Sequence, residues 1–218
     1  MKEIWFIRHG ESQANAGLAT PLPETIALTE RGIKQSKYIP AVFTETPDLI
    51  ITSPFLRTKQ TAEPTIIKFP NTKVEEWNAQ EFRYLSLTKY ADTTTELRRP
   101  FIEEYWNRGE ADFYDGDGTE SFAEFISRVS ALIRKVFETP QKTMAIFTHR
   151  QFVNATLWLL INDFPKINNA SMKRYYNFLS SVFVPNASIF KIYIDESSRD
   201  FRFSSIMTGH LPTGLITF

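Results

Sequence analysis

The chain has 218 residues, 42% of them hydrophobic and 14% aromatic, which is enough apolar material for one domain with its own core. Its 25 basic and 25 acidic residues cancel, so we expect neither nucleic acid nor a membrane as a partner, and any recognition of an anion has to be local. The absence of cysteine excludes disulfides, a thiolate nucleophile and cysteine-ligated zinc. No secretory leader pattern and no apolar run of ~20 residues occurs, so a cytoplasmic protein is expected.

The first predicted strand, residues 4–7, ends at Arg8-His9-Gly10. Such a strand brings a guanidinium and an imidazole to the edge of a sheet, and Gly10 lets the backbone turn and approach a ligand closely. Glu11-Ser12 can then begin a helix, whose free N–H groups favour an anion. The pattern predicts an oxyanion site with phosphate as the ligand, although an isolated histidine is more often structural.

A polar loop is predicted over residues 13–27. Thr29 can cap a helix that continues to Phe43, with a kink at Pro40 because proline removes a helical hydrogen bond. The second predicted strand covers residues 48–52.

Ser53-Pro54 has the pattern of an N-cap followed by proline in the first helical position. The predicted helix carries Arg57 and either ends or bends at Pro64. A third short strand is predicted near Val74.

Residues 82–118 are rich in aromatic and charged side chains, with helical segments predicted within 87–106. We interpret them as an insertion that covers one edge of the sheet, as a cap or specificity element. The acidic, glycine-containing stretch at 112–120 lacks the ligand spacing of an EF-hand and is predicted to be a loop.

Ser121 and Glu124 form a capping-box pattern before a helix whose apolar face extends to Phe137. The fourth strand is predicted at 143–148, directly before His149-Arg150 and another helix that ends near Ile161.

Residues 187–194 and 200–206 alternate apolar and polar side chains and predict a late pair of strands. Strands that alternate with helices indicate an α/β fold, a three-layer α/β/α sandwich with a mostly parallel central sheet and a helical insertion over the active-site edge. We expect residues 1–218 to form a single domain. In such folds the site lies at the carboxyl ends of the strands.

Arginine or histidine side chains follow three of the predicted strands. They lie in Arg8-His9, in the Ser53–Arg57 segment and in His149-Arg150. In a parallel sheet all three would face the same crevice. Guanidinium groups pair bidentately with phosphoryl oxygens, and one imidazole could attack phosphorus while the other donates a hydrogen bond. Taken alone, Arg57 would be interpreted as a solvated helix residue. Arginine or histidine side chains after three separate strands are much less readily explained as a coincidence.

The chain resembles the histidine phosphatase superfamily, also called the cofactor-dependent phosphoglycerate mutase family. The matching segments are Arg8-His9-Gly10-Glu11-Ser12 with Asn15, Leu28-Thr29-Glu30-Arg31-Gly32 with Gln35, Ser53-Pro54 with Arg57 and Gln60-Thr61-Ala62, Gly118 with Glu120-Ser121 and Arg128, His149, Asn186-Ala187-Ser188-Ile189, and His210-Leu211. One departure is plain: the family usually has glycine after its second histidine, and this chain has Arg150. That side chain either points to solvent or extends the phosphate-binding set into the pocket.

The resemblance implies that His9 is the nucleophile and forms a phosphohistidine, while Arg8, Arg57 and His149 bind the phosphoryl group. It also implies that Asn15 can bond a phosphate oxygen, although a turn residue is the alternative interpretation. No metal or other cofactor is expected, since cationic side chains supply the charge. His210 receives no catalytic role.

The same resemblance implies a carboxylic acid shortly after the third strand that protonates the leaving alkoxide and later activates water. The matching position is Glu81, with Glu75 and Glu76 as competitors.

The function that the sequence predicts is hydrolysis of a small phosphorylated metabolite. A phosphoglycerate mutase is the alternative, and the 82–118 insertion and Arg150 do not fit the mutase pattern. A catalytically silent binding module is less consistent, because every expected catalytic residue type is present. The expected partner is the small phosphorylated substrate. The sequence leaves open whether the protein also forms a homodimer.

Overall fold

The computed structural model describes residues 1–195, 197–198 and 200–218, and its centre is a six-stranded sheet in the order β3-β2-β4-β1-β5-β6. Strands β1 to β4 are parallel, whereas β5 and β6 are antiparallel to their neighbours, so the expected mostly parallel α/β sheet is confirmed. The strands are β1 Lys2–Arg8, β2 Leu49–Thr52, β3 Lys73–Glu76, β4 Thr143–Thr148, β5 Ile189–Ile194 and β6 Phe201–Phe203.

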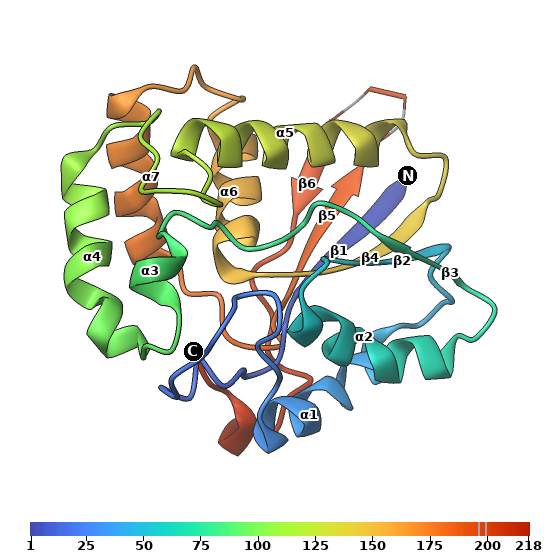
Figure 1. The fold of residues 1–218 in the computed structure, drawn as a ribbon. Helices are drawn as coiled ribbons and strands as arrows, with labels where there is room; N and C mark the ends of the chain where they lie inside the picture. The colour runs from blue at the N-terminus through green and yellow to red at the C-terminus, as the bar shows by residue number, and fades with distance from the viewer. Residues whose placement is uncertain (196, 199) are drawn as a thin grey trace.

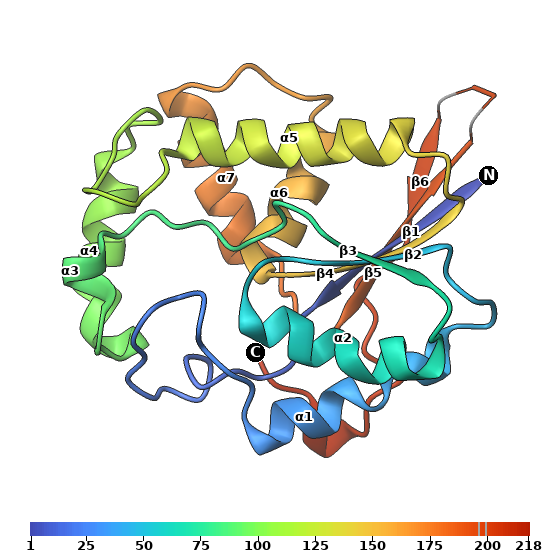
Figure 2. The same cartoon turned by 45° about the vertical axis from the view of Figure 1, so that its right-hand side comes forward.

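Helices lie on both faces of the sheet and beside it (Figures 1 and 2). They are α1 Glu30–Ser36, α2 Leu56–Lys68, α3 Leu87–Tyr90, α4 Thr95–Arg108, α5 Phe122–Glu138, α6 Arg150–Ile161 and α7 Asn169–Ser181, with 3₁₀ turns η1 Ile39–Val42 and η2 Thr213–Leu215. None of the helices within the described residues is both long enough and apolar enough to cross a bilayer.

The three layers follow from the alternation of side chains along each strand. On β1, Ile4 and Phe6 join a core with α5, α6 and α7, while Trp5 and Ile7 join a second core with α2 and η1. In both views α5 and α6 lie above the sheet and α1 and α2 below it, whereas α3 and α4 stand to one side (Figures 1 and 2).

The register of the parallel strands brings the candidate residues to one edge. Arg8 pairs with Thr148 at the ends of β1 and β4, and Thr52 pairs with Phe147 at the ends of β2 and β4. The residues that follow these strands therefore emerge side by side at the carboxyl edge of the sheet.

The helix expected from Thr29 to Phe43 is wrong in its extent. The Thr29 side chain caps α1 by accepting from the N–H of Gly32, but α1 ends at Ser36 and η1 follows separately. Pro40 is the reason, because it cannot donate to the carbonyl four residues earlier and its ring clashes there. The chain breaks before Pro40, which then occupies the first turn of η1.

Ser53 is not the cap of the following helix, which begins at Leu56 with Phe55 as its N-cap. Pro64 does not end α2, which continues to Lys68. Ile66 and Phe69, beyond the proline, pack against the core below the sheet, and this packing offsets the lost hydrogen bond.

Two further segments differ from the prediction. No helix was expected between 162 and 186, where α7 begins with a reciprocal capping pair of Asn168 and Ser171. The late strands β5 and β6 are shorter than the alternation of apolar and polar residues predicted.

The predicted capping box of Ser121 and Glu124 at the start of α5 is confirmed.

A close backbone contact holds the loop after β1 against α1. A Cβ on Gly32 would lie 2.1 Å from the carbonyl oxygen of Glu11, and one on Gly10 would lie 2.6 Å from the carbonyl oxygen of Gly32. Only glycine permits this approach at either position.

We therefore expect Gly32→Ala to lower the free energy of unfolding by about 1–3 kcal/mol, since an added methyl forces the backbone apart. Urea denaturation measures this loss. Gly214→Ala is the control, because a Cβ at Gly214 meets no atom within 4 Å. Equal midpoints for Gly32→Ala and the wild type would contradict the close contact.

Candidate active site

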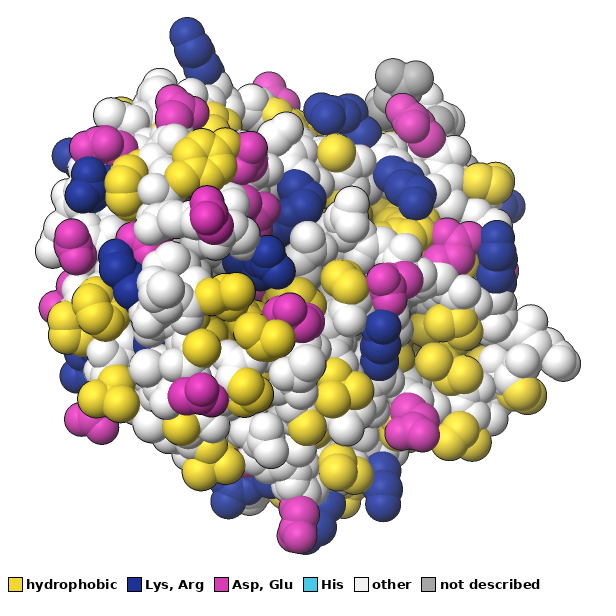
Figure 3. Space-filling model, viewed as in Figure 1, with side chains coloured by type: hydrophobic (Ala, Val, Ile, Leu, Met, Phe, Trp, Pro, Cys, Tyr) yellow, Lys and Arg dark blue, Asp and Glu magenta, His cyan; other side chains and the backbone are white. Residues whose placement is uncertain are grey.

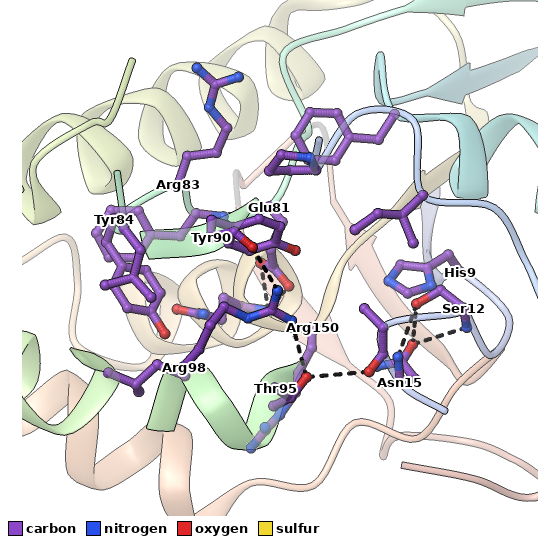
Figure 4. A pocket seen from close by; sticks show the side chains of 18 of the residues that line it. His9, Ser12, Asn15, Glu81, Arg83, Tyr84, Tyr90, Thr95, Arg98 and Arg150 are labelled. Atoms are coloured by element: carbon purple, nitrogen blue, oxygen red, sulfur yellow. Dashed lines mark hydrogen bonds between the residues drawn. The ribbon is translucent and has the colours of Figure 1, made fainter. Parts of the chain in front are cut away.

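A cavity of about 610 Å³ opens at the carboxyl ends of the parallel strands, between the sheet edge, the α3–α4 segment and α7. Six of the seven predicted site residues line it: Arg8, His9, Asn15, Arg57, Glu81 and Arg150. The close-up in Figure 4 shows His9 and Asn15 on one side and Glu81 and Arg150 toward the other. The structure thus brings together residues from five separate segments of the chain.

His9 is held at the end of β1 with a defined tautomer. Its backbone N–H donates to the carbonyl of Thr148 at 3.0 Å, and its ring Nδ1 donates to the carbonyl of Gly10 at 2.7 Å. This leaves the lone pair on Nε2, which accepts from Nε of Arg57 at 3.2 Å. Burial, together with the charges of Arg57 and Arg8, holds the pKa of His9 well below its ordinary value, so the ring is neutral.

Arg8 and Arg57 are buried and are anchored by backbone carbonyls rather than by carboxylates. Arg8 donates to the carbonyl of Val184, and Arg57 donates to that of Pro23 at 2.6 Å. Burial and the neighbouring charge of Arg150 lower the pKa of Arg8 to about 9, and burial lowers that of Arg57. Burying a guanidinium without a paired anion costs free energy, so Arg8 and Arg57 favour the binding of an anion in the cavity.

Asn15 is oriented by three donors that meet at its amide oxygen. They are the backbone N–H of Ser12 at 3.2 Å, the hydroxyl of Ser12 at 2.9 Å and the side-chain amide of Asn186 at 3.0 Å. Because the oxygen accepts all three, the Nδ2 amide is the group left to donate to a ligand.

Glu81 lies in the loop after β3 and faces the cavity. Its Oε1 accepts from the backbone N–H of Phe82 at 3.2 Å and from that of Gln151 at 3.1 Å. Burial raises the pKa of this carboxyl, against the opposing charges of Arg57, Arg8 and Arg150. The carboxyl is therefore protonated to a higher pH than a free glutamate.

The two competing carboxylates point elsewhere. Glu75 accepts from the indole of Trp77 at 2.7 Å and pairs with Lys73, while Glu76 pairs with Lys59 at 2.7 Å. Neither lines the cavity.

His149 is the one predicted site residue that does not line the cavity. It is fully buried beside His9, with the two ring centroids 5.1 Å apart, and its Nε2 is hydrogen-bonded to the hydroxyl of Ser53 at 2.8 Å. Burial, followed by the charge of Arg57, holds its pKa well below the ordinary value, so this ring is also neutral. Arg150 does reach the cavity, and its Nη2 donates to the carbonyl of Leu179 at 3.1 Å.

The cavity wall away from the sheet edge was not predicted residue by residue. It includes Tyr84, Tyr90, Arg98 and Trp106 from residues 82–118 and Tyr176 from α7. The high aromatic content of 82–118 was the available signal, but it could not tell which rings face a cavity. Within the described residues, no group of three or more histidine or acidic side chains is placed to hold a metal ion.

A family model described as the histidine phosphatase superfamily, branch 1, matches residues 4–201. No curated protein sequence gives a match.

Solved structures share the fold. A phosphoserine phosphatase from Entamoeba histolytica, in complex with 3-phosphoglyceric acid, is 20% identical with a TM-score of 0.72, covering 97% of this chain and 100% of that one. An alpha-ribazole phosphatase from Shigella flexneri is 21% identical with a TM-score of 0.69, covering 94% and 95%. A mycobacterial glucosyl-3-phosphoglycerate phosphatase is 18% identical with a TM-score of 0.67, covering 94% and 97%.

Proposed function

This chain belongs to the histidine phosphatase superfamily, and from that premise we propose that it hydrolyses a small phosphomonoester through a phosphohistidine on His9. The observation that carries the proposal is the neutral His9 ring, whose Nε2 lone pair meets the buried guanidinium of Arg57 in a cavity that also holds Arg8 and Glu81. The groups for a nucleophile, for anion-binding cations and for an acid thus share one cavity.

In the first step, Nε2 of His9 attacks phosphorus and the bond from phosphorus to the ester oxygen breaks. The leaving oxygen takes the proton of Glu81, which its raised pKa has retained. Arg8 and Arg57 stabilise the charge on the equatorial oxygens.

In the second step, the ionised Glu81 takes a proton from water, and the water oxygen attacks phosphorus. The bond between phosphorus and Nε2 breaks, the electron pair returns to the ring, and phosphate leaves. Both His9 and Glu81 are thereby restored.

We propose that no metal ion takes part, because guanidinium groups supply the positive charge that a metal would bring. Turnover is then expected to be unchanged by EDTA and to be inhibited by vanadate, which adopts the five-coordinate geometry of in-line displacement. Initial rates with p-nitrophenyl phosphate measure both effects. A strict requirement for added Mg²⁺ or Zn²⁺ would contradict this chemistry.

The experiment that tests the function is phosphate release from a panel of phosphorylated metabolites, with 3-phosphoglycerate assayed with and without 2,3-bisphosphoglycerate. Hydrolysis predicts free phosphate. Isomerisation without phosphate release would indicate a mutase, and binding without either product would indicate a silent module. We further propose that residues 82–118 act as the cap that selects the substrate, because their side chains form the far wall of the cavity.

A further inference from the structure

The side-chain amide of Asn15 has two ends with opposite hydrogen-bonding roles. Its oxygen can only accept and its Nδ2 group can only donate, so a phosphoryl oxygen binds this amide only when Nδ2 is turned toward it. Basic and acidic side chains are interspersed over the face seen in Figure 3, so recognition of an anion depends on donors within the cavity and not on the charge of this surface. The residues that hold Asn15 in one orientation therefore matter for binding.

The oxygen of the Asn15 amide faces donors on the side away from the ligand. The backbone N–H of Ser12 donates to Oδ1 at 3.2 Å, and the Ser12 hydroxyl donates to it at 2.9 Å, as Figure 4 shows. Nδ2 of Asn186 donates to the same oxygen at 3.0 Å. Because a backbone N–H can only donate, the atom that faces Ser12 has to be the oxygen, and Nδ2 lies on the opposite side of the amide.

Asn186 is the one of these donors that comes from a distant segment, and it is fully buried. Its Nδ2 also donates to the carbonyl of His9 at 3.4 Å, so it joins the Asn15 loop to the backbone of the proposed nucleophile. Its Oδ1 accepts from the hydroxyl of Thr217 at 3.1 Å, which determines the end of the Asn186 amide that faces Asn15. Thr217 lies outside residues 4–201, the part of the chain that the family model matches.

The hydroxyl of Thr217 is oriented in turn by Gln35, a buried residue of α1. The backbone N–H of Glu11 donates to Oε1 of Gln35 at 2.6 Å, so Nε2 occupies the opposite side of that amide. There Nε2 donates to the carbonyl of Leu215 at 2.6 Å and to Oγ1 of Thr217 at 2.9 Å. Because Oγ1 accepts from Gln35, the single hydrogen of the hydroxyl is directed to Asn186.

The hydrogen bonds of this network thus all run in one direction, from a backbone N–H to the amide at the cavity. The successive donors are Glu11, Gln35, Thr217 and Asn186, and the last acceptor is Asn15. Turning the Asn15 amide over would set its N–H groups against those of Ser12 and Asn186, and donors that face donors leave their hydrogen bonds unmade.

We propose that Gln35, Thr217 and Asn186 are positioning residues, which hold the Asn15 amide so that its Nδ2 group donates to an oxygen of the phosphoryl group. The inference rests on the proposed phosphatase function. Its physical basis is that hydrogen bonds arranged in series inside a protein polarise and strengthen one another, so a bond broken at Thr217 weakens the orientation of Asn15.

Thr217→Val tests the network, because valine has nearly the shape of threonine but no hydroxyl. We expect this variant to raise the inhibition constant of inorganic phosphate and to lower kcat/KM for p-nitrophenyl phosphate, each by roughly 10-fold, the lower end for one hydrogen bond to a charged group. Thr217→Ser keeps the hydroxyl and should restore wild-type values. Thr213→Val is the matched control, because Thr213 is an exposed residue of η2, and it should change neither value.

A double-mutant cycle separates positioning from general support of the fold. Asn15→Ala should lower kcat/KM by at least as much as Thr217→Val, and adding Thr217→Val to Asn15→Ala should have no further effect, because the group that Thr217 positions is already gone. If Thr217→Val instead causes the same loss with and without Asn15, the inference is overturned. Wild-type values for either single variant would overturn it as well.

Nuclear magnetic resonance observes the Asn15 amide directly. In the ¹⁵N-labelled wild type, the side-chain NH₂ signal of Asn15, identified by its absence from the Asn15→Ala variant, should shift when vanadate is added. In Thr217→Val this shift should be reduced. If vanadate inhibits the wild type but leaves the Asn15 signal in place, the positioning role is overturned, even where Thr217→Val does not fold.

Hydrolysis of p-nitrophenyl phosphate by the wild type separates this inference from the function beneath it. If no phosphate is released from this reagent or from any member of the metabolite panel, the phosphatase proposal fails and the positioning role falls with it. If phosphate is released but the effects of Thr217→Val and Asn15→Ala are absent or simply additive, only the positioning role fails.

Discussion

Replacing His9 with alanine is expected to lower turnover by on the order of 10⁶-fold, because the variant loses the imidazole that we propose forms the bond to phosphorus. The fold should persist, since alanine keeps the backbone hydrogen bonds of position 9 to Thr148 and Ala187 and loses only the ring contacts with Gly10, Arg57 and His149. Initial rates and a thermal denaturation curve measure the two effects separately.

Brief exposure of the wild type to ³²P-labelled substrate should place label on the protein in a linkage that is labile to acid and stable to alkali. His210→Ala is the matched control, because this third histidine is hydrogen-bonded to Ala187 and lies outside the cavity. The control should keep both turnover and label. Label that survives acid, or turnover by the His9→Ala variant, would refute the phosphohistidine.

Glu81→Gln is expected to lower kcat by about 10²–10⁴-fold, the range for loss of a general acid. The amide oxygen of glutamine can still accept from the N–H groups of Phe82 and Gln151, so the loop geometry should survive. The loss should be largest for alkyl phosphates and smaller for p-nitrophenyl phosphate if phosphorylation limits the rate, since that phenolate leaves with little help. Rapid quench with labelled substrate would reveal accumulation of the phosphoenzyme if dephosphorylation is the slower step.

The pH dependence of the rate, compared between the wild type and Glu81→Gln, independently tests Glu81 as the general acid. Burial raises the pKa of Glu81, so the acid is present up to a higher pH than usual and the rate should fall as pH rises through that raised pKa. This alkaline limb should be missing in Glu81→Gln. The lowered pKa of His9 keeps the nucleophile unprotonated, so its acid limb should lie below the ordinary histidine range.

Glu75→Gln and Glu76→Gln are the controls for the position of the acid. Their carboxylates form ion pairs with Lys73 and Lys59, away from the cavity, and both variants should stay near wild-type rates. If either control variant loses activity while Glu81→Gln turns over normally, the general acid is Glu75 or Glu76 and not Glu81.

Local sequence patterns predicted the secondary structure wherever short-range backbone preferences determine it. The six strands, the cap of Thr29 and the capping box of Ser121 were predictable because each depends on residues within a few positions. The carboxyl-edge position of His9 was predictable for the same reason, since a parallel sheet aligns the strand ends once the strands are known.

Prediction failed where a distant contact outweighed the local preference. Ser53 has the local pattern of a helix cap, but α2 begins only at Leu56. The Ser53 hydroxyl accepts from the N–H of Phe55 and also bonds His149, which is 96 residues away. Pro64 has the pattern of a helix end, but packing of Ile66 and Phe69 against the core carries α2 past it.

By itself, the sequence determined the class of fold and the edge of the sheet at which the predicted site residues gather. Only the tertiary structure decided that Glu81 rather than Glu75 or Glu76 faces the cavity, that His149 is buried beside His9, and that Arg98 lines the cavity. The physical reason is that hydrophobic burial is non-directional and acts between segments far apart in the chain, so which side chains meet depends on how whole helices and strands pack.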